Sequence, residues 1–107
     1  MSFRWPNKDP DETLDYSVDW SRYLDTATIS SVSWFVNNSS GVKTSLPQGS
    51  TVNTIINSAQ TTSTDNKTAT INVAGGTNNV EYTFTCQITD STGTVSERTI
   101  KLRVREK

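Results

Sequence analysis

The sequence predicts an all-β protein: a single β-sandwich of about seven strands, preceded by an extended N-terminal arm. Apolar and polar residues alternate over several short segments, which is the pattern of strands with one buried face. Turn-forming residues separate these segments at intervals of about 8 to 14 residues, as in sandwich domains. Ser, Thr and Asn are abundant, and they form helices poorly because their side chains compete for backbone hydrogen bonds. A chain of 107 residues has room for one domain.

The arm is predicted to span residues 1–12 and the sandwich residues 13–107. The arm carries Phe3 and Trp5, but two prolines interrupt regular strand pairing there. Two roles fit large aromatic side chains in such a segment. The arm is either a lid folded over the domain's own core or an extension that inserts into a neighbouring subunit.

The first predicted strand begins at Leu14, from which apolar residues alternate with acidic and polar ones up to Trp20. Segment 28–36 is rich in β-branched and aromatic residues, and Trp34 is predicted to lie at the centre of the core. A turn at 37–41 and a short strand at 42–46 follow.

The middle of the chain is less regular than its two ends. Apolar residues occur within 50–60, and a polar loop at 61–66, an alternating strand at 67–73 and a turn at 74–79 come next. Segment 81–104 is the clearest pattern, because Asp90-Ser91-Thr92-Gly93 joins two alternating strands into a hairpin with one solvent-exposed face. Trp34, together with Tyr82 in the penultimate strand, favours an immunoglobulin-like or fibronectin-like arrangement.

Charge and hydropathy argue against several classes of partner. Ten Lys and Arg balance eleven Asp and Glu, so the net charge of −1 gives no attraction to nucleic acid or to an anionic membrane. Residues 1–10 lack the basic start and apolar run of a signal peptide, and no stretch approaches the ~20 apolar residues of a membrane helix. We therefore expect a protein made soluble in the cytoplasm, with neither membrane nor nucleic acid among its partners.

The charges are unevenly distributed along the chain. Acidic residues crowd the N-terminal fifth, and basic residues crowd the C-terminal end from Arg98 onward. Both groups fit solvated faces of edge strands, where charge discourages aggregation. Alternatively, the two groups attract each other or oppositely charged partners.

No constellation of residues predicts catalysis, a cofactor or a metal. The chain has no histidine, and its single cysteine, Cys86, is in phase with apolar neighbours, as expected of a buried thiol. The acidic residues at 9–19 do not have the spacing of a calcium-binding loop. The basic residues at 98–105 lack the exposed aromatic partners of a single-strand nucleic-acid site. We predict a non-enzymatic protein without a cofactor.

The run Trp5-Pro6-Asn7-Lys8-Asp9-Pro10-Asp11-Glu12, with Leu14-Asp15-Tyr16 and Val18-Asp19-Trp20-Ser21 after it, resembles the opening of small structural proteins of tailed bacteriophages and prophages. Gly75-Gly76-Thr77 and the ending Glu97-Arg98-Thr99-Ile100-Lys101-Leu102-Arg103-Val104 are also similar. Members of this group are described as fibre–tail adaptors. The resemblance implies a virion protein, made in the host cytoplasm, that docks onto tail or neck proteins and connects fibres or neighbouring subunits, in multiple copies within a symmetric assembly.

For such a role we expect binding through aromatic anchors, strand edges and the charged run of the arm. The predicted partner-binding residues are Phe3, Trp5, Lys8, Asp9, Asp11, Glu12 and Tyr23. Two alternatives remain open at this point: a capsid decoration, or cement, protein that stabilises the head, and a cell-surface immunoglobulin-like binding module.

Overall fold

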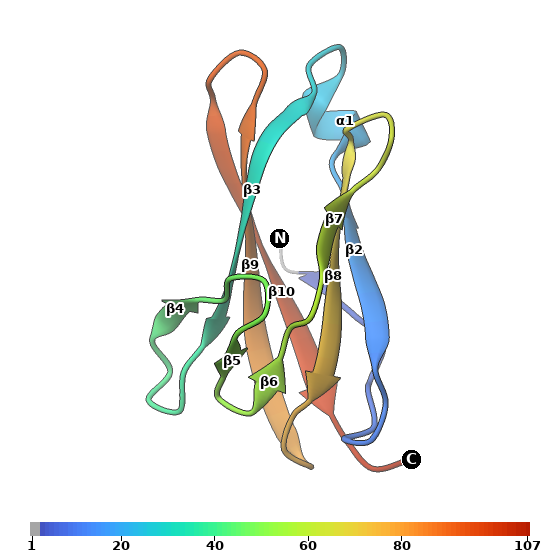
Figure 1. Cartoon of the computed structure of the whole chain (residues 1–107), viewed down its shortest axis with the longest axis vertical. Helices are drawn as coiled ribbons and strands as arrows, with labels where there is room; N and C mark the ends of the chain where they lie inside the picture. The colour runs from blue at the N-terminus through green and yellow to red at the C-terminus, as the bar shows by residue number, and fades with distance from the viewer. Residues whose placement is uncertain (1–2) are drawn as a thin grey trace.

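A computed structural model describes residues 3–107 of the chain, and of Phe3 it describes the backbone alone. The fold is a sandwich of two β-sheets, as the sequence predicts (Figure 1). The first, here called the β10 sheet, has the order β1 (Phe3–Arg4), β10 (Val95–Val104), β9 (Val80–Asp90), β3 (Ile29–Asn37) and β4 (Lys43–Ser45). The second, the β8 sheet, has the order β2 (Leu14–Asp19), β8 (Thr68–Gly75), β6 (Ile55–Ile56) and β5 (Thr51–Val52), and β7 (Gln60–Thr62) also pairs with β8.

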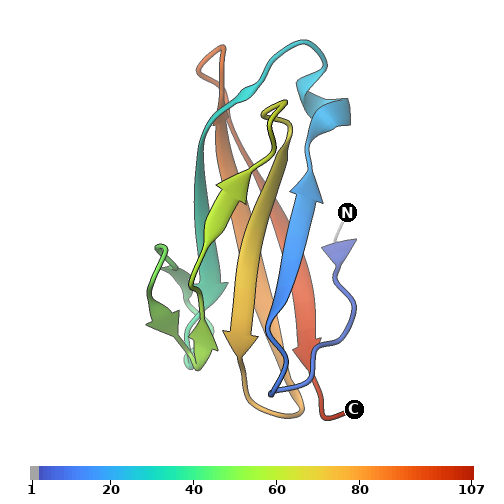
Figure 2. The same ribbon diagram turned by 45° about the vertical axis from the view of Figure 1, so that its right-hand side comes forward.

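Pairing is antiparallel except at the N-terminus, where β1 runs parallel to β10. Figure 2 shows β1 beside β2, at the side of the sandwich where the chain crosses from one sheet to the other. The division into an arm of residues 1–12 and a sandwich of residues 13–107 stays a prediction, and so does the immunoglobulin-like type of the sandwich. The parallel pairing of β1 makes the described part of the arm an edge of the β10 sheet.

Three sequence predictions need correction. Residues 3–107 contain ten strands instead of about seven, mainly because segment 50–62 divides into β5, β6 and β7. The predicted loop at 61–66 begins as part of β7, which pairs with β8. A one-turn helix, α1 (Ser21–Leu24), occurs where no helix was expected; it buries Leu24 after Trp20 ends the alternation of β2.

The predicted alternation places its apolar members in the core. Trp34 is 2% exposed and lies opposite Cys86 in the register of β3 with β9. Cys86 is itself buried, and burial raises the pKa of its thiol to about 12. Such a thiol is un-ionised at neutral pH and acts as a small apolar side chain. Within residues 3–107, no helix is long and apolar enough to cross a membrane.

The hairpin of β9 and β10 closes at the predicted turn. Asp90 Oδ1 accepts hydrogen bonds from the backbone N–H of Thr92 (2.9 Å) and of Thr94 (3.0 Å), and from the Thr92 hydroxyl (2.6 Å). Gly93 has φ +90°, a conformation that glycine adopts without steric cost. The carboxylate of Asp90 therefore fixes the turn that sets the register of the two longest strands.

The turn between β8 and β9 depends on a glycine in close contact with β10. Gly76 has φ +95°, and a Cβ atom there would stand 2.7 Å from Val104 Cγ2. Gly76→Ala combines left-handed backbone strain with overpacking, so we expect the free energy of unfolding to fall by about 2–5 kcal/mol. Chemical denaturation measures this change.

The control is Gly93→Ala, where the backbone is equally unfavourable but no atom lies within 4 Å of the added Cβ. We expect this variant to lose about 1–2 kcal/mol, the strain alone. Equal losses in the two variants would mean that contact with Val104 does not constrain the turn.

Candidate docking surfaces

Trp5 of the arm lies inside the sandwich and is 8% exposed. Its ring stacks on Tyr16 of β2 with 4.7 Å between ring centroids, and it also contacts the rings of Trp34 and Phe84. Its Nε1 donates a hydrogen bond to the Ser17 carbonyl (3.2 Å). Two roles were considered for the arm, and the position of Trp5 is that of a lid over the chain's own core. The Phe3 side chain lies outside the described part of the molecule.

Lys8 is fully buried, an unusual position for lysine. Its Nζ donates hydrogen bonds to the carbonyl oxygens of Gly75 (2.6 Å) and Asp9 (2.8 Å), while its backbone forms a parallel bridge with Val104. Burial lowers the pKa of the ammonium, and the nearby carboxylates, Glu12 foremost, act in the opposite direction. Lys8 ties the arm to the turn between β8 and β9 and is not accessible to a partner in this conformation.

The acidic run after Lys8 forms a tight turn held by its own side chains. Asp9 Oδ1 accepts from the backbone N–H of Asp11 (2.9 Å), and Glu12 Oε1 accepts from the backbone N–H of Asp9 (2.8 Å). Lys107 joins the turn, because its backbone N–H donates to Asp9 Oδ2 and its Nζ pairs with Glu12, both at 2.8 Å. Asp11 is exposed on the outside of this acidic turn.

Tyr23 lies at the opposite end of the sandwich from the acidic turn, on α1. It is 45% exposed, its ring meets Trp20 edge-on at 5.7 Å, and its hydroxyl is hydrogen-bonded to the Ser96 hydroxyl of β10. An aromatic ring that is half-exposed but held in place loses little conformational entropy when it binds a partner. The structure therefore separates Tyr23 from the arm residues with which the sequence analysis grouped it.

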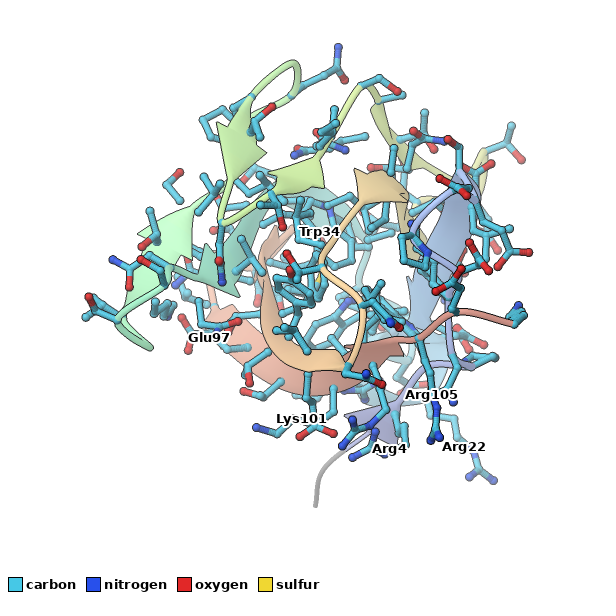
Figure 3. All side chains as sticks on the ribbon, turned by 90° about the horizontal axis from the view of Figure 1, so that it is seen from below. Arg4, Arg22, Trp34, Glu97, Lys101 and Arg105 are labelled. Atoms are coloured by element: carbon cyan, nitrogen blue, oxygen red, sulfur yellow. The ribbon has the colours of Figure 1, made fainter. Side chains whose placement is uncertain are left out.

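Basic side chains gather along the outer edge formed by β1 and β10. Figure 3 shows Arg4 and Arg105 pointing outward on one side of the molecule, and Lys101 also points outward from the same sheet. Arg4 pairs with Glu81 at 2.7 Å, and Lys101 Nζ donates to the Thr83 hydroxyl at 2.9 Å. We call Arg4, Lys101, Arg103 and Arg105 together the basic edge. Lys101, Arg103 and Arg105 belong to the basic C-terminal end that is evident in the sequence, and the pairing of β1 with β10 brings Arg4 next to them.

Cavities lie on two opposite sides of the sandwich, and no pattern in the sequence predicts either of them. One, of about 260 Å³, is lined by Trp5 and Ile100, Val18, Ser17, Asp19, Arg4 and Arg98. The other, of about 220 Å³, lies between β3 and β7 and is lined by Val32, Trp34, Gln48, Gln60, Thr61 and Thr62. Trp34 Nε1 is buried without a hydrogen-bond partner among the described residues, which costs about 1–3 kcal/mol.

The described residues include no group of three or more His, Cys, Asp or Glu arranged to hold a metal ion. The surface features suit binding to other proteins. They are an acidic turn at one end, an aromatic residue at the other, a basic edge and a polar cavity. A family model described as podophage GP4 fiber-tail adaptor protein gp77 matches residues 8–103. The chain belongs to this family. No curated protein matches the sequence.

Membership in the fiber-tail adaptor family makes this chain a structural protein of the phage virion. The match begins at Lys8 and ends at Arg103, so it includes the acidic turn, the strands from β2 to β10 except the last residue of β10, and Lys101 and Arg103 of the basic edge. The resemblance found in the Lys8–Glu12 run and in the C-terminal strand is thereby confirmed at the level of the family.

Trp5→Ala tests the role of the arm as a lid. Removing a buried indole that touches three other rings leaves a large cavity, so we expect the free energy of unfolding to fall by about 3–5 kcal/mol. Urea denaturation followed by circular dichroism gives the value. Tyr23→Ala, at a half-exposed aromatic ring, is the matched control and should lose much less. A Trp5→Ala variant as stable as the wild type would show that Trp5 is not part of the core, and Trp5 would then be a candidate for docking.

Stability should decline in acid because several carboxyl groups have lowered pKa values, among them Asp9, Glu12 and Asp90. The causes are the Lys107 backbone N–H for Asp9, the Lys107 side chain for Glu12 and the Thr92 hydroxyl for Asp90. A carboxyl whose pKa is lower in the folded state stabilises the fold above its ordinary pKa and loses this contribution as pH falls through the folded value. We expect a constant melting temperature from pH 7 to about 5 and a decline below about pH 4.

Asp90→Asn separates the contribution of the hairpin turn to the acid dependence of stability from the contributions of Asp9 and Glu12. It removes one titrating carboxyl, so the variant should melt lower at pH 7 and decline less steeply in acid. An acid decline in Asp90→Asn as steep as in the wild type would show that Asp90 does not contribute to the pH dependence.

Proposed function

We propose that this chain docks onto tail or neck proteins of a tailed phage and connects them to fibres or to neighbouring copies of itself. The observation that supports this most directly is the family match over residues 8–103. The proposal goes further than the family description in assigning surfaces, and the geometry of the two ends supports that assignment. We also propose that the chain has no enzymatic activity, in keeping with a structural adaptor family.

Two opposite ends of the sandwich carry the contacts in this proposal. The acidic turn offers Asp11, with Asp9 and Glu12 partly accessible beside it, and α1 offers Tyr23. A protein that joins two others needs two separate binding surfaces, and a rigid sandwich keeps them at a fixed distance. Trp5 and Lys8 serve docking indirectly, because they anchor the arm and so fix the position of the acidic turn.

Electrostatics gives the adaptor a preferred orientation. The acidic turn lies in the crossing from β1 to β2, whereas the basic edge follows β1 and β10 along the outer face. The side chains of both surfaces are exposed or half-buried, so they contribute mainly to the rate and direction of approach, and less to affinity. Neighbouring copies in a symmetric ring can bring one such surface against the other.

A capsid decoration role is the second candidate, since a small sandwich also suits a cement protein. The family description favours the tail. Copy number separates the two roles, because an adaptor is present in proportion to the tail and a cement protein in proportion to the capsid lattice. The cell-surface binding module has no observation in its favour.

Particles of the phage that encodes this chain provide the test. We expect particles made without the protein to have filled heads and to lack fibres by electron microscopy, and quantitative mass spectrometry to give wild-type particles a copy number matched to the tail. Fibre attachment should return with the wild-type protein and should be roughly tenfold weaker with Tyr23→Ala, the loss of one aromatic hot spot.

Val42→Ala is the matched control, because Val42 is 57% exposed and lies in the loop before β4, away from both proposed contacts. It should restore fibres fully. Particles that keep their fibres without the protein, or a copy number matched to the capsid, would refute the adaptor role.

A further inference from the structure

On one side of the sandwich, the edge of β3 that faces away from β9 has no neighbouring strand before Trp34. The register of β3 with β4 covers Phe35 to Asn37, and a last hydrogen bond joins the Leu46 N–H to the Trp34 carbonyl (2.9 Å). Backbone groups in a strand point alternately to its two sides, so those of Val32 point the same way as those of Trp34. At Val32 the chain of β4 has already turned away at Pro47, and the edge is open.

The facing strand of the other sheet has an open edge as well. The Ala59 carbonyl accepts from Asn72 N–H, and Ser63 N–H donates to the Thr68 carbonyl, so the odd-numbered residues of this segment face β8. The backbone of Gln60 and Thr62 must therefore face away from β8. Gln48 Oε1 accepts from the Gln60 N–H at 3.0 Å, which leaves the backbone of Thr62 without a strand partner.

The 220 Å³ cavity lies between these two edges, since Val32, Gln60 and Thr62 all line it. Figure 1 shows β3 and β7 on the same side of the sandwich, one in each sheet. The lining contains carboxamides and hydroxyls but no charged side chain. Trp34, 2% exposed, also lines the cavity, and its Nε1 has no hydrogen-bond partner in the described residues. Open strand edges beside an uncharged polar lining indicate a site for an extended segment with backbone groups to pair.

The opposite side of the sandwich is protected in a way that this side is not. There, β2 has its own free edge, but Trp5 Nε1 donates to the Ser17 carbonyl and Arg98 Nη1 donates to the Asp19 carbonyl at 2.9 Å. Proteins usually protect strand edges with charged or bulky side chains in this manner. The edges of β3 and β7 carry no such protection in the described residues beyond Gln48.

We propose that the β3–β7 opening receives an extended, uncharged segment of a neighbouring virion protein, which adds a strand to the sandwich. Packed sheets stand ~10 Å apart and paired strands ~4.8 Å apart, so one strand fits between two facing edges. The polar, uncharged lining selects small polar residues such as Ser, Thr, Asn and Gly. The inference rests on the proposed function, because it names the chemistry of one partner of the adaptor.

The N-terminal arm of a second copy is a poor occupant of the same opening. It carries Trp5, Lys8 and the acidic turn, and the β3–β7 opening has neither the apolar lining nor the charges to match them. A segment of another protein is therefore the occupant that we infer.

Hydrogen exchange measured by mass spectrometry tests this on the free protein and on intact particles. Strand addition gives new hydrogen bonds to the amides along the open edges, so segments 30–34 and 60–62 should exchange at least about tenfold more slowly in particles. Segment 51–52, the free edge of β5, is the internal control and should not change.

Thr62→Pro is the matching variant, because it removes an N–H that faces away from β8 and that the fold does not use. It should enter particles at least about tenfold less than the wild type. Thr51→Pro makes the same change on the edge of β5 and should enter normally. If Thr62→Pro melts at a lower temperature than the wild type, Thr62→Lys replaces it in the test, because a charge at the edge opposes strand pairing.

The outcomes separate the two proposals. A chain absent from particles refutes the proposed function and this inference with it. A chain present in particles whose segments 30–34 and 60–62 exchange as fast as in the free protein refutes the strand addition and leaves the adaptor role standing. Equal entry of Thr62→Pro, Thr62→Lys and the wild type also refutes the strand addition.

Discussion

The insertion of Trp5 between the two sheets is the contact on which the rest of this structure depends. A small domain with few apolar residues buries a limited fraction of its surface, so one indole that touches Tyr16, Trp34 and Phe84 is a large share of its core. Because Trp5 is held inside, the backbone on either side of it must follow β10, first as β1 and then through the bridge at Lys8. The position of the acidic turn therefore follows from the burial of a side chain several residues before it.

The same contact divides the molecule into a closed side and an open side. On the closed side, Trp5 and Arg98 satisfy backbone carbonyls of β2 with their own side chains. On the open side, β4 is short and ends before Pro47, so the part of β3 before Trp34 pairs with β9 alone and its other edge is free. A sandwich that was closed on both sides would be more stable, because the backbone groups of the free edges would pair. An adaptor whose open side is completed by another protein recovers this free energy on assembly, which ties its stability to its function.

Alternation in the sequence was sufficient to predict β2, β8, β9 and β10, because these long strands bury one face and a single shift in register would expose it. It failed for β5 to β7, which are two or three residues long and take their positions from hydrogen bonds of side chains such as Asn57 and Gln60 with distant carbonyls. The burial of Lys8 could not be predicted from the local sequence either. A lysine beside three acidic residues has the pattern of a solvated surface, and its burial depends on the carbonyl of Gly75, 67 residues later in the chain, as well as on that of Asp9. Local patterns predict faces of strands, whereas the candidate surfaces come from contacts between distant segments.

The exposed surface also constrains how such a protein can bind. Among the described residues, the large apolar side chains that are exposed are Tyr23, Val42, Ile56 and Val95, which belong to four different segments. Stable protein interfaces usually have an apolar centre, and scattered single residues do not provide one. Affinity must therefore come largely from backbone hydrogen bonds at strand edges, single aromatic anchors and charge complementarity, each of them modest. Modest contacts become effective when many copies act together, because the second contact of a linked set forms at a high effective concentration. A chain with this surface is suited to a multi-subunit particle, in which symmetry supplies the affinity that one copy lacks.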